Sequence, residues 1–219
     1  MIKICILGLG YVGLPLCLTI SKKYETAGFD INKDRIDSLS KKKDVNNEFK
    51  SSELINKNIL FTNKISDVKK FNFFIICVPT PITNKNKPDL RPVQKSFNLL
   101  SKILKKGDII ILESTVYPGV TKKYSSFLEK KTKLKNNKDF YVCYSPERIN
   151  PGDKENDLTK INKILAISTK NSSIIKKVKK VYNNFCKKLI VTKNIEESEA
   201  AKVIENIQRD LNIAIFNEI

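Results

Sequence analysis

The stretch ILGLGYVGLPLCLTI, residues 6 to 20, decides how the chain folds at its start. Its composition leaves three interpretations: a secretory signal, a membrane anchor, or a buried strand and helix joined by a glycine turn. Glycines at turn spacing and Pro15 in the first helical turns argue against a membrane span, which needs about 20 unbroken apolar residues. No small-residue cleavage site follows, as a secretory signal would require. We therefore expect a strand, a tight turn and a helix.

The glycines of this stretch have the spacing of a dinucleotide-binding turn. Gly8, Gly10 and Gly13 form G-x-G-x-x-G between the expected strand and helix. The first allows the tight turn, the second lets a pyrophosphate approach the backbone, and the third lets helix and strand pack closely. Asp30 ends the next expected strand, where a carboxylate can bind both ribose hydroxyls. These residues predict an NAD site, with an ordinary glycine turn as the structural alternative.

The charges around this site favour NAD over NADP. A 2'-phosphate would meet the negative charge of Asp30, which disfavours NADP. Arg35, on the following helix, is expected to lie beside the adenosine. A lone arginine weakens the preference for NAD without reversing it.

The remaining sequence alternates strand-like and helical segments. Strands are expected at residues 2–8, 24–30, 71–78, 108–114, 140–145, 163–169 and 188–192. Runs that are apolar throughout, rather than alternating, indicate a parallel sheet covered on both faces. The predicted fold class is therefore α/β, a Rossmann-like doubly wound, mostly parallel sheet. Residues 41–58 are weakly patterned and are expected to form a helical insertion or a loop.

The character of the sequence changes at Ile195. From there the chain has helix-forming residues without Gly or Pro, and it is still helical in pattern at its last residue. We expect residues 1–193 to form an NAD-binding Rossmann-like domain and residues 194–219 the start of a long central helix. Apolar residues such as Phe216 have nothing downstream to pack against. We therefore expect an incomplete protein, or a partner that supplies the missing core.

Composition excludes several classes of function. The net charge is +18, but the lysines are spread over almost every segment and only four residues are arginines. Nucleic-acid binding wants clustered charge and arginine geometry, so it is not expected as the main role. Five cysteines without a C-x-x-C pair indicate neither disulfides nor zinc, and they suggest a reducing, cytoplasmic location. Without histidine, proton transfer must use Lys, Glu, Asp, Thr, Tyr or Cys, and no metal is expected.

Three further motifs follow expected strands. CVPTPI carries Thr80 and ESTVYPGVT carries Thr115, each at the carboxyl edge of a parallel sheet, where doubly wound folds bind ligands. Capping or turn formation is the alternative for both hydroxyls. In YSPERINPGD, Glu147 stands next to Arg148. In a lysine-rich chain this arginine indicates a planar fork for a phosphate or a sugar carbonyl, with a surface ion pair as the alternative.

The expected final helix carries a polar stripe. Lys202, Asn206 and Arg209 stand at i, i+4 and i+7, which places them on one helix face. A solvated face would have the same spacing. Because apolar residues cover much of the rest of the helix, we expect the stripe to face a cleft.

Taken in order, six motifs resemble the UDP-sugar 6-dehydrogenase family: GLGYVGLPL, GFDIN, VPTP, ESTVYPG, SPERINPG and KVIENIQRDLNIAIFNE. They are most similar to the branch that oxidises UDP-N-acetylmannosamine or UDP-N-acetylglucosamine to the uronic acid, for polysaccharide biosynthesis. The resemblance implies NAD contacts from Tyr11, Val12, Asp30, Arg35, Thr80 and Thr115. It implies a nucleotide-sugar site lined by Arg148, Ile149, Lys202, Asn206 and Arg209.

The resemblance also implies a chemistry. The 6-hydroxyl gives up hydride twice to two NAD, and a cysteine traps the aldehyde and is later released from a thioester. Lys202 and Asn206 would stabilise the oxyanion, while Glu147, helped by Thr115, would manage water and protons. The family's cysteine lies beyond the central helix, which also forms a homodimer in a full-length chain. We therefore expect this chain to be limited to NAD binding.

Two other functions remain open. A β-hydroxyacid dehydrogenase of the 6-phosphogluconate type also joins a Rossmann domain to a helix bearing a lysine, but ESTVYPG and SPERINPG have no counterpart there. A non-catalytic NAD-binding subunit, or a remnant of an enzyme, would need only the first part of the site.

Overall fold

The computed structural model describes residues 1–55, 59–147 and 161–219, and within them it forms one sheet with helices around it. The strands are β1 (Lys3–Leu7), β2 (Glu25–Phe29), β3 (Ile59–Thr62), β4 (Phe73–Ile76), β5 (Ile109–Leu112), β6 (Tyr141–Tyr144), β7 (Asn162–Ala166) and β8 (Lys188–Thr192). The helices are α1 (Gly13–Ser21), α2 (Lys33–Ser40), α3 (Arg91–Leu100), α4 (Val120–Thr132), α5 (Ser172–Tyr182) and α6 (Ile195–Glu218), with a short 3-10 helix at Ile65–Val68.

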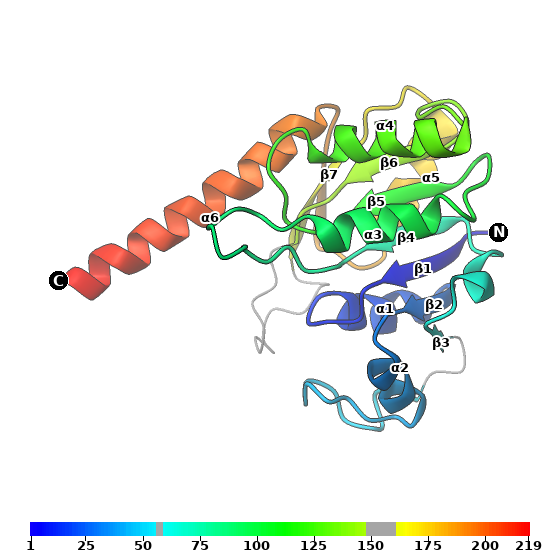
Figure 1. Ribbon diagram of the computed structural model, residues 1–219, viewed down its shortest axis with the longest axis horizontal. Coiled ribbons are helices and arrows are strands. Elements are labelled where there is room, and N and C mark those ends of the chain that lie inside the picture. Colours follow the sequence, from blue (N-terminus) through cyan, green and yellow to red (C-terminus); the bar gives the residue numbers. More distant parts are fainter. Residues whose placement is uncertain (56–58, 148–160) are drawn as a thin grey trace.

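The strand order is that of a doubly wound sheet. It runs β3-β2-β1-β4-β5-β6-β7-β8, and every neighbouring pair is parallel except β6 with β7. The order reverses between β1 and β4, which is the point where such sheets bind ligands at their carboxyl edge. Figure 1 shows α6 leaving the sheet as a long projecting helix. The expected Rossmann-like fold, followed by a long helix, is confirmed.

Both faces of the sheet are covered, which explains the continuous apolar runs in the sequence. In β4, Phe73 and Ile75 belong to one core and Phe74 and Ile76 to the other, and all four are buried. Side chains of α1, α2 and α5 complete the first core, and those of α3 and α4 complete the second. Each such apolar side chain contributes roughly 1.5–3 kcal/mol by leaving water.

The weakly patterned segment after α2 differs from the helical interpretation. Its described part, residues 41–55, forms turns, in agreement with the loop alternative. The edge strand β3 follows it and was not anticipated. Of its four residues only Thr62 is buried, and its apolar run, Ile59 to Phe61, is three residues long, shorter than the runs that mark the central strands. Across the described ranges, no helix is both long and apolar enough to span a membrane.

Candidate functional site

The glycine turn between β1 and α1 has two glycines that the fold itself requires. Gly8 has φ +93°, a conformation that side chains rarely adopt, and a Cβ there would lie 2.9 Å from the carbonyl oxygen of Cys77. A Cβ on Gly13 would lie 1.8 Å from the carbonyl oxygen of Gly8, which is an impossible contact. These two positions let the helix pack directly against the strand.

Gly10 is different, because the packing of the described residues does not require a glycine there. Apart from its two chain neighbours, a Cβ at this position would meet no described atom within 4 Å, and Gly10 is exposed just before α1. The open space lies at a helix N-terminus, where backbone N–H groups and the helix dipole favour an anion. The turn therefore fits the pyrophosphate of a dinucleotide. Tyr11, 49% exposed, and half-buried Val12 follow on the same turn.

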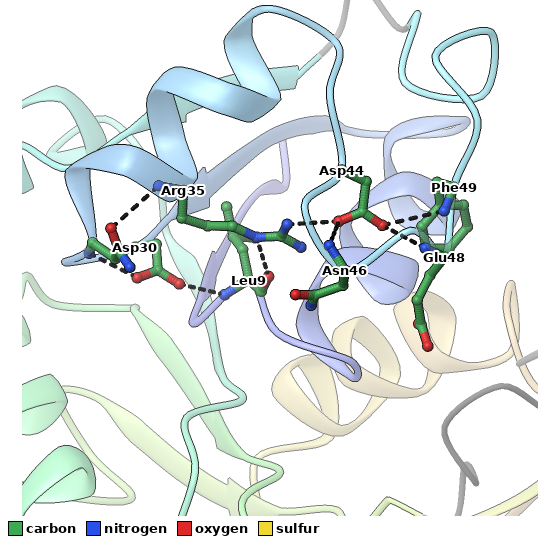
Figure 2. Close-up of polar contacts among 8 residues, drawn as sticks. Leu9, Asp30, Arg35, Asp44, Asn46, Glu48 and Phe49 are labelled. Carbon is green, nitrogen blue, oxygen red and sulfur yellow. Dashed lines mark hydrogen bonds and ion pairs between the residues drawn. The ribbon is translucent and has the colours of Figure 1, made fainter.

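Asp30 is fixed against this turn at the end of β2. Its Oδ2 accepts a hydrogen bond from the backbone N–H of Leu9 at 2.8 Å, and its Oδ1 accepts one from Asn32 at 2.9 Å (Figure 2). The residue is half-buried. The carboxylate is thus held next to the glycine turn, as binding of an adenosine ribose requires.

Arg35 holds the carbonyl group of the same residue, Leu9. Its Nε donates to the carbonyl oxygen of Leu9 at 3.0 Å, and its Nη1 pairs with Asp44 Oδ1 at 2.6 Å. The residue is 7% exposed, and Nη2 has no hydrogen-bond partner among the described residues. Sequence reasoning placed Arg35 beside the adenosine and missed Asp44. Asp44 lies in the weakly patterned loop, where no signal marks it.

The two hydroxyl-bearing turns expected at the sheet edge lie together. Thr80 follows β4 and Thr115 follows β5, and these strands are parallel neighbours. The Thr80 hydroxyl donates to the carbonyl oxygen of Thr115 at 2.8 Å, and Ser114 donates similarly to Val78 at 2.7 Å. The two turns therefore form one rigid wall farther along the edge that carries the glycine turn.

Glu147 follows β6 and belongs to a buried charged cluster. Lys163 Nζ, from β7, contacts Glu147 Oε2 and lies 2.9 Å from Glu113 Oε2. The Tyr182 hydroxyl donates to the other oxygen of Glu113 at 2.6 Å. All four residues are buried. Burial raises the pKa of Glu113, and the charge of Glu147 adds to this, while Lys163 opposes it.

An ion pair between Glu147 and its neighbour Arg148 was the structural alternative from the sequence, and the described residues do not test it; they show a contact of Glu147 with Lys163. Arg148 and Ile149 lie outside the described residues. Lys163 and Glu113 were missed, although each is a charged residue at one end of an apolar strand run, which is a usable signal. The acid/base role of Glu147 stays a prediction.

The polar stripe on α6 runs from the domain into solvent. Lys202 is 5% exposed, with its Nζ 3.5 Å from Glu205 Oε2. Asn206 is half-buried and Arg209 is exposed, and Arg209 Nη2 donates to Asn206 Oδ1 at 2.9 Å. The structure therefore embeds Lys202 in the domain and leaves the end of the stripe open.

Glu199 anchors the helix that carries Lys202. Its buried carboxylate accepts hydrogen bonds from the backbone N–H groups of Gly119 at 2.6 Å and Thr121 at 2.8 Å, and from the Thr121 hydroxyl at 2.6 Å. These donors stand at the N-terminus of α4, where a negative charge is favourable. Glu199 therefore ties α6 to the segment that directly follows the Thr115 turn. Sequence reasoning missed it.

We expect Glu199→Gln to lower the free energy of unfolding by about 2–3 kcal/mol, because an amide offers one oxygen to three donors. Urea unfolding followed by circular dichroism measures this. Glu196→Gln is the matched control on the same helix. Glu196 is partly exposed, and its ion pair with Lys122 is long, at 3.8 Å between Oε1 and Nζ. This substitution should cost less than about 0.5 kcal/mol. Equal losses in both variants would contradict the anchoring role.

The cysteines do not supply a nucleophile at this site. Cys5, Cys17 and Cys143 are buried in the two cores, and burial raises the pKa of each thiol. Cys77, at the end of β4, has its pKa raised by burial and by the charge of Glu113. Burial raises the pKa of the Cys186 thiol as well. A nucleophilic cysteine needs a lowered pKa, which none of the five has.

Comparison with known proteins agrees with this geometry. Residues 2–186 match the NAD binding domain of the UDP-glucose/GDP-mannose dehydrogenase family. The chain is 47% identical to UDP-N-acetyl-D-glucosamine 6-dehydrogenase of Salmonella typhi and 46% identical to that of Pseudomonas aeruginosa, covering the whole chain and 52% of each relative. The solved UDP-D-ManNAc dehydrogenase of Pyrococcus horikoshii superimposes with TM-score 0.90 at 32% identity, over 99% of this chain and 53% of that one.

The chain thus spans about half the length of the curated relatives it matches. A 3-hydroxyisobutyrate dehydrogenase of Mycobacterium tuberculosis is 15% identical with TM-score 0.67, a likeness that shows the fold alone. The cofactor of the matched domain is NAD, and the open Gly10 position and the fixed Asp30 suit it. The chain belongs to the UDP-glucose/GDP-mannose dehydrogenase family.

Proposed function

We propose that this chain provides the NAD-binding half of an enzyme that oxidises the C6 hydroxyl of a UDP-N-acetylhexosamine to the uronic acid. The observation that carries the proposal is the shared edge of the sheet. The glycine turn, Asp30, Thr80, Thr115 and Glu147 follow parallel strands that end on the same side. Relatives named for UDP-N-acetylglucosamine and UDP-N-acetylmannosamine support this choice of substrate.

Each part of the edge has a role toward the cofactor. The N-terminus of α1 and the open Gly10 position would bind the pyrophosphate, and Asp30 the ribose hydroxyls. Thr80 and Thr115 would contact the cofactor farther along the edge. Bound NAD would supply the hydride acceptor. The wall formed by the Thr80–Thr115 hydrogen bond keeps this contact rigid.

The residues on α6 and after β6 would act on the sugar. Lys202 is buried, so its ammonium group would stabilise a developing oxyanion more strongly than it would in water, with Asn206 beside it. Glu147 would hold or release protons from its position against Lys163. Arg148, Ile149 and Arg209 are proposed to bind the nucleotide sugar. The cysteine that traps the aldehyde would come from the other half of the enzyme and not from the five cysteines of this chain.

The exposed apolar side chains of α6 support a dimer. They are Ile204, Ile207, Leu211, Ile213, Ile215 and Phe216, with Ile219 directly after the helix. We propose that α6, within residues 194–219, belongs to a homodimer interface and that residues 1–193 form the NAD-binding domain. Long helices with such apolar surface are usually covered by a partner.

The test compares the isolated chain with a fusion to the C-terminal half of the Salmonella typhi relative. Calorimetry with NAD should show binding to both proteins, while NADH formation from UDP-N-acetylglucosamine or UDP-N-acetylmannosamine should occur only in the fusion. Lys202→Met should abolish turnover in the fusion, and Lys193→Met, at an exposed position, should not. An inactive fusion that still binds NAD would favour the non-catalytic subunit. Formation of NADH by the isolated chain would contradict the proposal that this chain lacks the nucleophile.

A further inference from the structure

Two opposite charges stand beside the expected adenosine site and favour different cofactors. A carboxylate at the end of the second strand selects NAD, whereas a nearby arginine accommodates the 2'-phosphate of NADP. This chain has both, in Asp30 and Arg35. Whether Asp30 or Arg35 sets the choice of cofactor depends on whether the guanidinium can reach the ribose.

The contacts of Arg35 turn it away from the ribose side. Figure 2 shows the guanidinium reaching toward Asp44, with Leu9 between it and the carboxylate of Asp30. Its Nε is held by the Leu9 carbonyl at 3.0 Å and its Nη1 by Asp44 at 2.6 Å. The side chains of Arg35 and Asp44 are only 8% and 0% exposed.

Asp44 is itself locked, so it is not free to release the arginine. Three backbone N–H groups donate to its carboxylate at 3.0–3.1 Å, from Asn46, Glu48 and Phe49. Burial alone would raise the pKa of Asp44, but the hydrogen bonds from Arg35 and Asn46 lower it below its usual range. The carboxylate is therefore ionised at neutral pH and cancels the charge of Arg35.

We propose that Asp44 is a specificity-determining residue of the cofactor site: it neutralises Arg35 and holds it away from the ribose, so that NADP meets Asp30 without a compensating cation. The inference rests on the NAD binding in the proposed function and adds a residue that sets the choice of cofactor. Nη2 of Arg35 already has no hydrogen-bond partner among the described residues, and without Asp44 its Nη1 would lose its partner too. Arg35 would then be a buried cation whose planar fork matches the geometry of a phosphate.

Calorimetry of NAD and NADP binding to four forms of the chain tests this: wild type, Asp44→Asn, Arg35→Gln and the double variant. The ratio of the NADP to the NAD dissociation constant should fall about tenfold or more in Asp44→Asn, and it should return to the wild-type ratio in the double variant. Glu48→Gln is the matched control, because it removes one negative charge from the same loop, and it should leave the ratio unchanged. An unchanged ratio in Asp44→Asn, or an equal fall in Glu48→Gln, would overturn the inference.

Arg35→Gln gives an independent answer if Asp44→Asn does not fold, since Asp44 also organises its loop. If Arg35 is held as proposed, its loss should weaken NAD and NADP binding by the same factor, through the Leu9 carbonyl. A selective loss of NADP affinity would show that Arg35 already reaches the 2'-phosphate, and the inference would be wrong. Wild-type chain that binds neither cofactor would instead refute the proposed function.

Discussion

Gly10→Ala is expected to lower the affinity for NAD by about 100-fold or more while leaving the chain as stable as the wild type. Apart from its chain neighbours, the added methyl group would meet no atom of the described residues within 4 Å, so this part of the fold has room for it. It would occupy the space through which a pyrophosphate approaches the backbone. Alanine also restricts the unfolded chain, which stabilises a protein by roughly 0.4–1 kcal/mol where the backbone is compatible. Calorimetry with NAD and urea unfolding measure the two effects separately.

Gly13→Ala is the matched comparison, three residues along the same turn. Its methyl group would lie 1.8 Å from the Gly8 carbonyl oxygen, so the strand and helix must separate and stability must fall. Loss of NAD binding in this variant would come from unfolding of the turn. If Gly10→Ala bound NAD normally, the pyrophosphate would not lie on this turn. If it lost stability as Gly13→Ala does, Gly10 would be a structural residue.

The fold could be predicted because its determinants are local. Continuous apolar runs mark strands that are covered on both faces, and β4 has all four residues buried. The glycine spacing and the acid after the second strand depend only on nearby positions, and the structure brings Asp30 to Leu9 as expected. The edge strand β3 was missed because its apolar run, Ile59 to Phe61, is only three residues long, shorter than the runs that mark the central strands.

The charged contacts around the site could not be predicted, because each joins residues that sequence spacing does not relate. Glu199 contacts Thr121 on another helix, and Lys163 joins Glu113 to Glu147. Their partners are defined only once the strands are ordered. The sequence offers at most a hint, namely a charged residue at one end of an apolar run. For Arg35 and Asp44 even this hint is missing, because the partner lies in a loop without pattern.

Lys163→Met is expected to lower the free energy of unfolding by about 3–5 kcal/mol, which is the usual cost of removing one partner from a buried ion pair. Methionine has a similar length, so the cavity is small and the loss comes from charge. Lys163 is fully buried between the carboxylates of Glu113 and Glu147, and both would lose its positive charge. Urea unfolding near neutral pH, followed by circular dichroism, measures the loss.

The pH dependence separates this charge effect from a packing defect. Burial raises the pKa of Glu113 even with Lys163 present, and removing the cation must raise it further. A carboxyl whose pKa is higher in the folded state stabilises the fold at low pH, and this contribution disappears as the pH rises through the folded pKa. Lys163→Met should therefore approach wild-type stability in acid, where the carboxyls are protonated.

Lys70→Met is the control, because the Lys70 side chain is 57% exposed beside Glu25. This substitution should lower the free energy of unfolding by at most about 1 kcal/mol. A loss in Lys163→Met that is no larger than in Lys70→Met, or that does not change with pH, would show that Lys163 does not hold the two carboxylates together.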